Sequence, residues 1–532
     1  MQTHDQHWLN HLDTQHGHQP HPSEMNRRGV LAGLVAGAGG LLLPQSALSQ
    51  GTPKRGGLLR MGMSGGSASD SMDPRTYADS IPIAYSMMVW NLLIEIDGKG
   101  NAVPELAESW EARPGAADWT FSIRRGITFT SGKTLDADDV IYSINLHRGE
   151  TKSPAKALLS GIKAMTKTSS HQIRIELNAG NADLPYVFSD YHIIIVPTGT
   201  VDFAKAEGTG AYTITEWQPG VRLAAKRKPG GYWKPNRGNF DAVELRYIVD
   251  TAARTQALVT GQVDATNRLD PKTVGFLSRN SALRVSRTRG VGQRFAFVAH
   301  TDKEPFRKRD LMLALKYGID RKKIVDNVYS GYATIGNDHT IGPMNKYHDA
   351  NQVQRPYDPD KARFHLAKSG VTGPIELLVS EGAFEASIDA GVLFQESAKR
   401  AGIAIDIKRV SGDGYWDNVW LKAPFCAVYW GNRPTADQQL STTFVSGGNW
   451  NDTRYTNPIF DKLVVDARAE LDESRRRAMY AQAQAMLSEE AGMICFAIGD
   501  TLDGCSAKLA GLEPSGRFDM SDQRLAEKGW FL

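Results

Sequence analysis

Patterns typical of strands alternate with patterns typical of helices from about residue 50 to the end of the chain. The strand patterns alternate apolar and polar residues, whereas the helix patterns repeat apolar residues every three to four positions. The clearest strands are predicted at residues 119–123 and 245–249, and the clearest helices at residues 252–260, 311–317 and 472–487. Such alternation predicts α/β lobes with mixed sheets. At 532 residues the chain is too long for one compact domain, since a domain typically holds about 100–200 residues.

Capping residues mark the ends of these helices. Asp136 precedes a helix whose first turn contains Asp138 and Asp139, so it is predicted to cap the N-terminus, with Val140, Ile141 and Ile144 forming the buried stripe. Gly261 is predicted to end the helix at 252–260 in a left-handed conformation. Asp472 is predicted to cap the helix at 472–487, with Arg475, Arg476 and Arg477 on its solvent-exposed face.

Residues 25–49 have the features of a secretory signal peptide. Arg27 and Arg28 precede fifteen uncharged apolar residues, 29–43, and small residues follow up to Ser49. Cleavage near Ser49 and residence in the periplasm are therefore predicted. The alternative, a membrane anchor, is disfavoured because a bilayer span needs about 20 residues. The paired arginines suggest twin-arginine export, but the residues after them leave ordinary secretion open.

Residues 1–24 contain six of the 13 histidines. Such a tract could bind metal. The preferred interpretation is an upstream extension that is not native, with translation beginning at Met25.

The composition excludes several classes of protein. Lysine and arginine exceed aspartate and glutamate by only three, which is too balanced for a nucleic-acid-coating protein. Three cysteines cannot build a disulfide framework and lack zinc-site spacing. Cys495 and Cys505 could pair, but three buried thiols are equally compatible with the sequence.

One catalytic motif requires weighing. Residues 62–66 match G-x-S-x-G, the pattern that presents a nucleophilic serine in hydrolases, here Ser64. That motif needs a helix directly after the serine, whereas the following residues favour a loop. The seven histidines after residue 50 are scattered singly, so the sequence predicts no metal, no cofactor and no catalytic residue. A secreted serine hydrolase using Ser64 remains the enzymatic alternative.

Aromatic residues gather between positions 415 and 450. Tyr429, Trp430 and Trp450 are interleaved with the hydrogen-bonding residues Asn432 and Arg433. Aromatic walls with a few polar groups are typical of a pocket for a small organic solute. Trp416 and Trp420 are assigned mainly to packing, whereas Trp430, beside Gly431, is expected in a loop facing ligand.

Ordered motifs along most of the chain resemble the family 5 extracellular solute-binding proteins, the dipeptide, oligopeptide and nickel receptors of ABC importers. The resemblance rests on residues 71–74, 103–110, 119–129, 134–140, 208–212, 305–306, 314–321 and 455–461. It implies a two-lobed periplasmic binding protein fold of type II, a clamshell with an additional subdomain in lobe I. Lobe I would comprise residues 52–290 plus 492–532, with the subdomain at about 98–200, and lobe II residues 291–491. Crossing strands near 295–298 and 494–498 would form the hinge.

The resemblance also implies a function without catalysis: a receptor that captures a solute between its lobes and delivers it to an inner-membrane ABC permease and its ATPase. In peptide-binding relatives a segment resembling W-x-x-D-Y-x-x-P supplies an aspartate for the peptide α-ammonium. Here the matching stretch begins at Trp430 and has Arg433 instead of an acid. Asp437 or Asp452 could supply the missing charge from a neighbouring turn.

The resulting hypothesis is a monomeric receptor for a peptide, a modified amino acid or an opine-like solute that carries a hydrogen-bond acceptor. Arg433 and Asn432 would bind the acceptor, with stacking on Trp430; alternatively, Arg433 forms a structural ion pair. The predicted ligand-binding residues are Tyr429, Trp430, Gly431, Asn432, Arg433, Asp437, Trp450, Ser64 and Asp73. A nickel or haem carrier is the second alternative.

Overall fold

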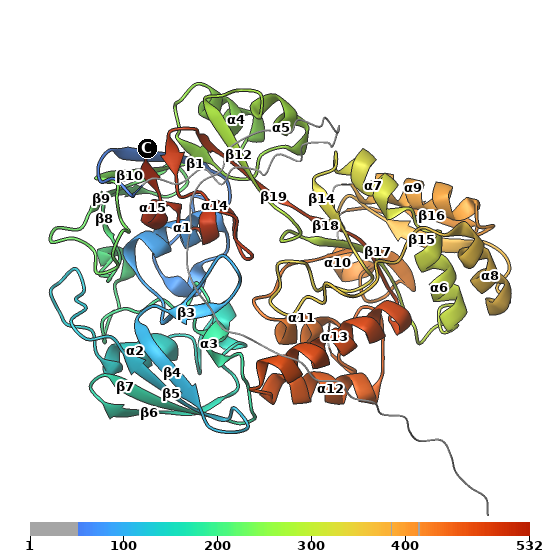
Figure 1. The fold of residues 1–532 in the computed structure, drawn as a ribbon, viewed down its shortest axis with the longest axis horizontal. Helices are drawn as coiled ribbons and strands as arrows, with labels where there is room; N and C mark the ends of the chain where they lie inside the picture. The colour runs from blue at the N-terminus through green and yellow to red at the C-terminus, as the bar shows by residue number, and fades with distance from the viewer. Residues whose placement is uncertain (1–51, 385, 413–414, 449) are drawn as a thin grey trace, which may run out of the picture. The chain divides into compact units, whose positions relative to one another are not determined.

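The computed structural model describes residues 52–384, 386–412, 415–448 and 450–532. The predicted extension and signal peptide, including the cleavage site, lie outside these residues. Within the described chain, two mixed β-sheets carry most of the core, and a smaller antiparallel sheet stands apart from them (Figure 1).

The first mixed sheet combines strands from the beginning, middle and end of the chain. Its spatial order is β12-β19-β11-β1-β10-β9-β8. The strands are β1 (Leu58–Met63), β8 (Tyr212–Gln218), β9 (Arg222–Arg227), β10 (Ala242–Tyr247), β11 (Ala265–Thr266), β12 (Leu283–Thr288) and β19 (Thr501–Ser506). Strand β1 pairs in parallel with both β10 and β11, whereas β9 and β19 run antiparallel to their neighbours.

The second mixed sheet has the order β14-β18-β13-β17-β15-β16. Its strands are β13 (Arg294–Ala299), β14 (Ala333–Ile335), β15 (Ile375–Val379), β16 (Ile405–Arg409), β17 (Phe425–Trp430) and β18 (Met493–Gly499). Strand β13 is apolar from Phe295 to Ala299 and buried except at the half-buried Phe295, as expected for a strand covered on both faces.

The antiparallel sheet lies within the segment where an inserted subdomain was expected. It consists of β4 (Ala107–Ala112), β5 (Asp118–Ile123), β6 (Ile162–Ser169) and β7 (Gln172–Leu177) in the order β4-β5-β7-β6. Its apolar side chains form a core of their own with Val140 and Ile144 of α2 (Ala137–Asn145). The hairpin of β2 (Ile94–Ile96) and β3 (Ala102–Pro104) and the pair β20 (Leu509–Ala510) and β21 (Trp530–Phe531) complete the strands.

The helices are distributed among these sheets. Near the first sheet and the antiparallel sheet lie α1 (Ser80–Val89), α2 (Ala137–Asn145), α3 (Leu184–Val187), α4 (Thr251–Val259), α5 (Pro271–Leu277), α14 (Asp519–Asp522) and α15 (Leu525–Lys528). The chain of the second sheet contributes α6 (Arg309–Gly318), α7 (Arg321–Val328), α8 (Pro359–Ser369), α9 (Ser387–Lys399), α10 (Tyr415–Asn418), α11 (Ala436–Thr443), α12 (Pro458–Ala469) and α13 (Glu473–Glu490).

Two chain segments cross between the mixed sheets. Strand β12 leads into β13, and β18 leads into β19, so the crossings fall between Thr288 and Arg294 and at Asp500. The segments expected at the hinge are instead strands β13 and β18 inside the second sheet. The Asp500 carboxylate joins the crossings by accepting hydrogen bonds from Gly290 N at 2.9 Å and from Arg287 Nε at 2.6 Å.

Most local predictions agree with the structure. Asp136 caps α2 in a reciprocal capping box with Asp139, and Asp472 caps α13. Gly261 has a positive φ directly after the C-cap of α4. The predicted strand at 245–249 ends earlier, at Tyr247.

The expectation that all three arginines of α13 face solvent is wrong for Arg476. Its side chain is buried and pairs with Asp183 at 2.7 Å, whereas Arg475 and Arg477 are exposed. A run of three arginines in the sequence does not indicate which of the side chains is buried in the folded protein.

Candidate functional site: a cavity between the two mixed sheets

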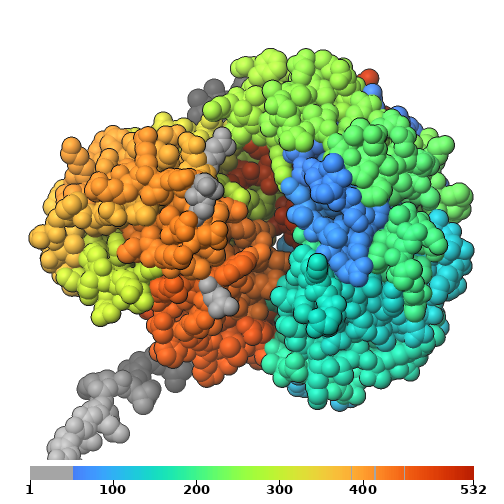
Figure 2. All heavy atoms as spheres, turned by 180° about the vertical axis from the view of Figure 1, so that it is seen from behind, coloured from blue at the N-terminus to red at the C-terminus, as the bar shows by residue number. Residues whose placement is uncertain are grey.

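A cavity lined by residues from the chain segments of both mixed sheets lies beside the crossing strands. It holds about 850 Å³ and is lined from the first sheet's side by Asp79, Arg268 and Phe518, among others, and from the second by Tyr429, Gly431 and Arg433. Figure 2 shows the surface hollowed between the orange and the blue parts of the chain. A cavity of this size accommodates a small organic molecule.

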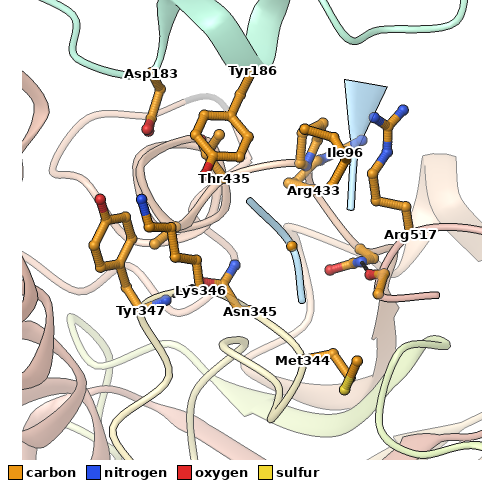
Figure 3. A pocket seen from close by; sticks show the side chains of 15 residues that line it. Ile96, Asp183, Tyr186, Met344, Asn345, Lys346, Tyr347, Arg433, Thr435 and Arg517 are labelled. Atoms are coloured by element: carbon orange, nitrogen blue, oxygen red, sulfur yellow. Dashed lines mark hydrogen bonds between the residues drawn. The ribbon is translucent and has the colours of Figure 1, made fainter. Parts of the chain in front are cut away.

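A narrow pocket adjoins the cavity, and the two share Asn432, Arg433, Pro434 and Arg517 in their walls. Figure 3 shows its other walls: Asp183, directly before α3, Tyr186 of α3, and Met344 to Tyr347 from the loop between β14 and α8. The segments around Arg433 and Arg517 therefore bound both spaces, whereas the other walls belong to the narrow pocket.

Arg433 lies directly after β17, in the segment that leads to α11. Its backbone N–H donates to Gln439 Oε1 at 3.0 Å, and its guanidinium lies 5.8 Å from the Trp450 ring centre. Burial lowers the pKa of Arg433, and a contribution from Tyr191 opposes the shift only in part. Within the described residues no carboxylate forms an ion pair with it, so the structural ion pair considered above is not present there.

Asn432 has a different role from the one expected. Its side-chain oxygen accepts from Arg294 at 2.7 Å, and its amide donates to the Gly516 carbonyl at 3.0 Å. Asn432 thus ties the second sheet to the C-terminal segment, and both ends of its amide are already engaged.

Trp430 does not lie in a loop, so this prediction is wrong. It is the last residue of β17, its side chain is 4% exposed, and its indole N–H donates to Asp452 Oδ2 at 3.0 Å. Among the aromatic residues predicted to bind ligand, Tyr429, at 36%, and Trp450, at 47%, are the exposed ones instead. β-Strand alternation explains the difference, because Tyr429 and Trp430 point to opposite faces of the sheet.

Trp416 and Trp420 pack as expected. Their ring centres lie 5.5 Å apart, and Trp416 also meets Tyr429 edge to face at 5.3 Å. Trp420 donates to the same Asp452 oxygen as Trp430, at 3.1 Å. The aromatic residues therefore form one connected layer above a buried carboxyl group.

The remaining predicted acids are engaged elsewhere. Asp437 accepts from Arg468 Nε at 2.9 Å, and burial raises its pKa. Asp73 pairs with Arg75 at 2.6 Å and caps a short 3-10 helix. The structure does not bring these two residues together with Arg433 in either pocket described above.

Ser64 follows β1 in a loop, as the sequence indicated. Its backbone N–H donates to Asn267 Oδ1 at 3.0 Å, and the next α-helix begins only at Ser80, after the short 3-10 helix Pro74–Thr76. The helix that a nucleophilic serine requires directly after it is absent from this described segment.

Sequence reasoning missed Arg517 and Lys346. Both line the narrow pocket, but they come from segments far from Arg433 along the chain. Arg517 donates to the Ser189 hydroxyl at 2.9 Å and to the Ser189 carbonyl at 3.0 Å. No periodicity or local motif links these positions.

In the part of the chain that the structure describes, no three metal-binding side chains cluster suitably for an ion, and no helix is long and apolar enough to span a bilayer. Cys426, Cys495 and Cys505 are buried free thiols, which settles the pairing left open by the sequence.

Two α/β lobes, crossing strands between them and a solute-sized cavity at the crossing define a solute-binding protein. The model of the bacterial extracellular solute-binding proteins, family 5 middle, matches residues 101–452, and the chain belongs to this family. This assignment favours a binding function over the serine hydrolase alternative.

Relatives and solved structures agree with the assignment. The chain is 25% identical to di/tripeptide-binding protein 1 of Pseudomonas aeruginosa over 460 residues, covering 79% of this chain and 85% of that protein. It is 26% identical to heme-binding protein A of Haemophilus influenzae over 455 residues, covering 77% and 82%. DppA from Helicobacter pylori, in complex with the peptide STSA, superposes with a TM-score of 0.69 at 19% identity, covering 90% of this chain and 98% of DppA. The two-lobed periplasmic binding protein fold is therefore confirmed.

Proposed function

We propose that the protein is a periplasmic receptor that captures a peptide-like or other small polar organic solute bearing an anionic group. It would deliver the solute, chemically unchanged, to an ABC permease and ATPase at the inner membrane. Lobe I would comprise residues 52–290 plus a C-terminal segment that begins at Asp500 rather than at the expected residue 492, because β18 lies in the second sheet. Lobe II would then comprise residues 291–499, and the protein would act as a monomer. The observation that most supports this proposal is that Arg433 lines the cavity between the sheets. This cation has no carboxylate partner in the described chain.

The charge at Arg433 favours an acidic group on the solute. A half-buried arginine without a counter-ion loses part of its solvation, which a bound carboxylate would offset. A free peptide α-ammonium is served less well, because Asp437 is engaged by Arg468 and Asp452 is buried beneath two indoles. Tyr429 and Phe518 offer aromatic surface in the same cavity.

The relatives support this class of solute without specifying it. One relative is named for di- and tripeptides and the other for heme. Both kinds of ligand are organic molecules with carboxylates. A modified amino acid, an opine-like conjugate or a blocked peptide would satisfy the same chemistry. A directly bound nickel ion is not supported by any cluster of ligands in the described residues.

Two measurements test the proposal. Native mass spectrometry of protein purified from the periplasm would identify the solute, and calorimetry would compare its affinity for the wild type, Arg433→Ala and Arg475→Ala. Loss of a buried, hydrogen-bonded charge partner costs about 2–5 kcal/mol, so Arg433→Ala should weaken binding by at least about 30-fold. Arg475, exposed on α13, provides the matched control.

Unchanged affinity in Arg433→Ala would remove Arg433 from the site. Recovery of haem or a metal chelate would identify a carrier of the second alternative class. Turnover of the recovered solute, or labelling of the protein by a fluorophosphonate that is lost in Ser64→Ala, would contradict a receptor function.

A further inference from the structure

The narrow pocket beside the cavity is the size of one small functional group. It offers about 30 Å³ to water-sized groups, which is room for about two waters. Figure 3 shows three cationic side chains around it: Lys346, Arg433 and Arg517. They come from three separate segments, which are the loop after β14, the residues after β17 and the C-terminal segment.

The other charges at this pocket are paired. Lys346 contacts Glu473 at 2.9 Å, and Asp183 contacts Arg476 at 2.7 Å. Arg517 lies 3.6 Å from Asp522. Arg433 alone among these groups has no carboxylate partner in the described chain. Pairing thus leaves a surplus of one positive charge at the pocket.

We infer that the narrow pocket is the subsite for a single carboxylate of the solute, held by Arg433 from one lobe and Arg517 from the other. The inference rests on the proposed function and narrows its anionic group to a monocarboxylate. The two oxygens of a carboxylate match the space and the surplus charge, and guanidinium groups bind carboxylates through paired hydrogen bonds. The remainder of the solute would occupy the adjoining cavity.

The geometry disfavours the related groups. An amide group has no negative charge to balance the surplus positive charge of the pocket. A phosphate dianion has one negative charge more than that surplus and needs more room. Arg517 is pre-positioned, because Ser189, itself buried, accepts two of its hydrogen bonds. A carboxylate between Arg433 and Arg517 contacts both lobes, so it would favour the closed form.

Acetate tests the subsite independently of the unidentified solute. Nuclear magnetic resonance with carbon-13-labelled acetate, in Tris chloride at constant ionic strength, should show saturable binding in the millimolar range. Acetamide should not displace acetate, and sulfate should displace it only weakly. Arg433→Gln should raise the acetate Kd at least about tenfold, since hydrogen bonds to charged groups are lost, and Arg517→Gln should raise it several-fold.

The matched control is Arg475→Gln, which removes the same charge from the exposed face of α13 and should bind acetate like the wild type. Arg433→Lys retains the charge without the planar fork and should lie between the wild type and Arg433→Gln. Circular dichroism would confirm that each variant is folded. Acetate affinity that is equal in folded Arg433→Gln and the wild type, or the absence of saturable acetate binding, would overturn the inference.

The two proposals can fail separately. A solute that binds the cleft of a protein with no acetate site would overturn the carboxylate subsite alone. Acetate binding at Arg433 in a protein that carries and binds no organic solute would overturn the receptor function alone.

Discussion

Asp452 is a fully buried acid whose Oδ2 accepts both indole N–H groups of Trp420 and Trp430, while its Oδ1 has no hydrogen-bond partner among the described residues. Burial raises its pKa to about 7. The unfolded carboxyl ionises near its ordinary pKa, whereas the folded one keeps its proton until about pH 7. The free energy of unfolding therefore decreases as the pH rises from the ordinary carboxyl pKa to about 7. Above that pH the decrease is complete.

This predicts that Asp452→Asn, which keeps an oxygen for the indoles but cannot ionise, is less sensitive to pH. Between pH 5 and pH 8 the wild type should lose about 2–3 kcal/mol relative to the variant. Urea unfolding at both pH values measures the difference. A constant difference between the two proteins would show that Asp452 ionises normally in the fold.

The three thiols lead to a second prediction at this scale. Burial raises the pKa of both Cys426 and Cys495 to about 12 and also raises that of Cys505. A protonated, buried thiol is a poor nucleophile. The native protein should therefore react negligibly with a thiol reagent at pH 8, and all three cysteines should react in denaturant. Rapid reaction of the native protein would contradict this burial.

Residue identity in the site was only partly predictable. Gly431 and Arg433 were found because glycine and a charged residue interrupt an aromatic segment, a local signal. Trp430 is buried because it is the last residue of β17, whereas the sequence analysis expected it in a loop. The approach of Arg517 to Arg433 depends on chain crossings that leave no local pattern.

At the scale of elements, α3 and α13 are joined by the buried pair of Asp183 and Arg476. The Asp183→Ala variant should lose about 3–5 kcal/mol of unfolding free energy, since it leaves a buried charge unpaired. The double variant Asp183→Ala/Arg476→Met should recover much of the loss. Denaturant unfolding of the four proteins in the double-mutant cycle measures the coupling, and additive losses would show that the pair is not coupled.

Helix caps such as Asp136 and Asp472 were predictable because capping uses residues adjacent in sequence. The backbone conformation of the segment labelled α14 was not predictable from the sequence. Four successive residues, Met520 to Gln523, have positive φ although none is glycine. Left-handed backbone at such residues costs about 1–2 kcal/mol each, so only tertiary contacts, such as Asp503 accepting from Met520 N at 2.8 Å, can hold it.

At the scale of the whole described molecule, the α/β class and the two lobes followed from alternating patterns and family motifs. The positions of the crossings did not follow from the sequence. The apolar pattern of β13 and β18 would be the same in a strand within a lobe and in a strand that crosses between lobes. Asp500 now places the crossing beside the cavity, where it joins the two connecting segments. Closure about this point would hold a solute between Arg433 and Arg517, which line the same narrow pocket.

Small-angle X-ray scattering with the solute recovered from the native protein tests this account most directly. The radius of gyration of the wild type should fall when the solute is added to saturation, because contacts with both lobes favour the closed form. Arg433→Ala should remain at the solute-free value at the same concentration. A saturated wild-type protein whose scattering does not change would contradict solute capture by lobe closure.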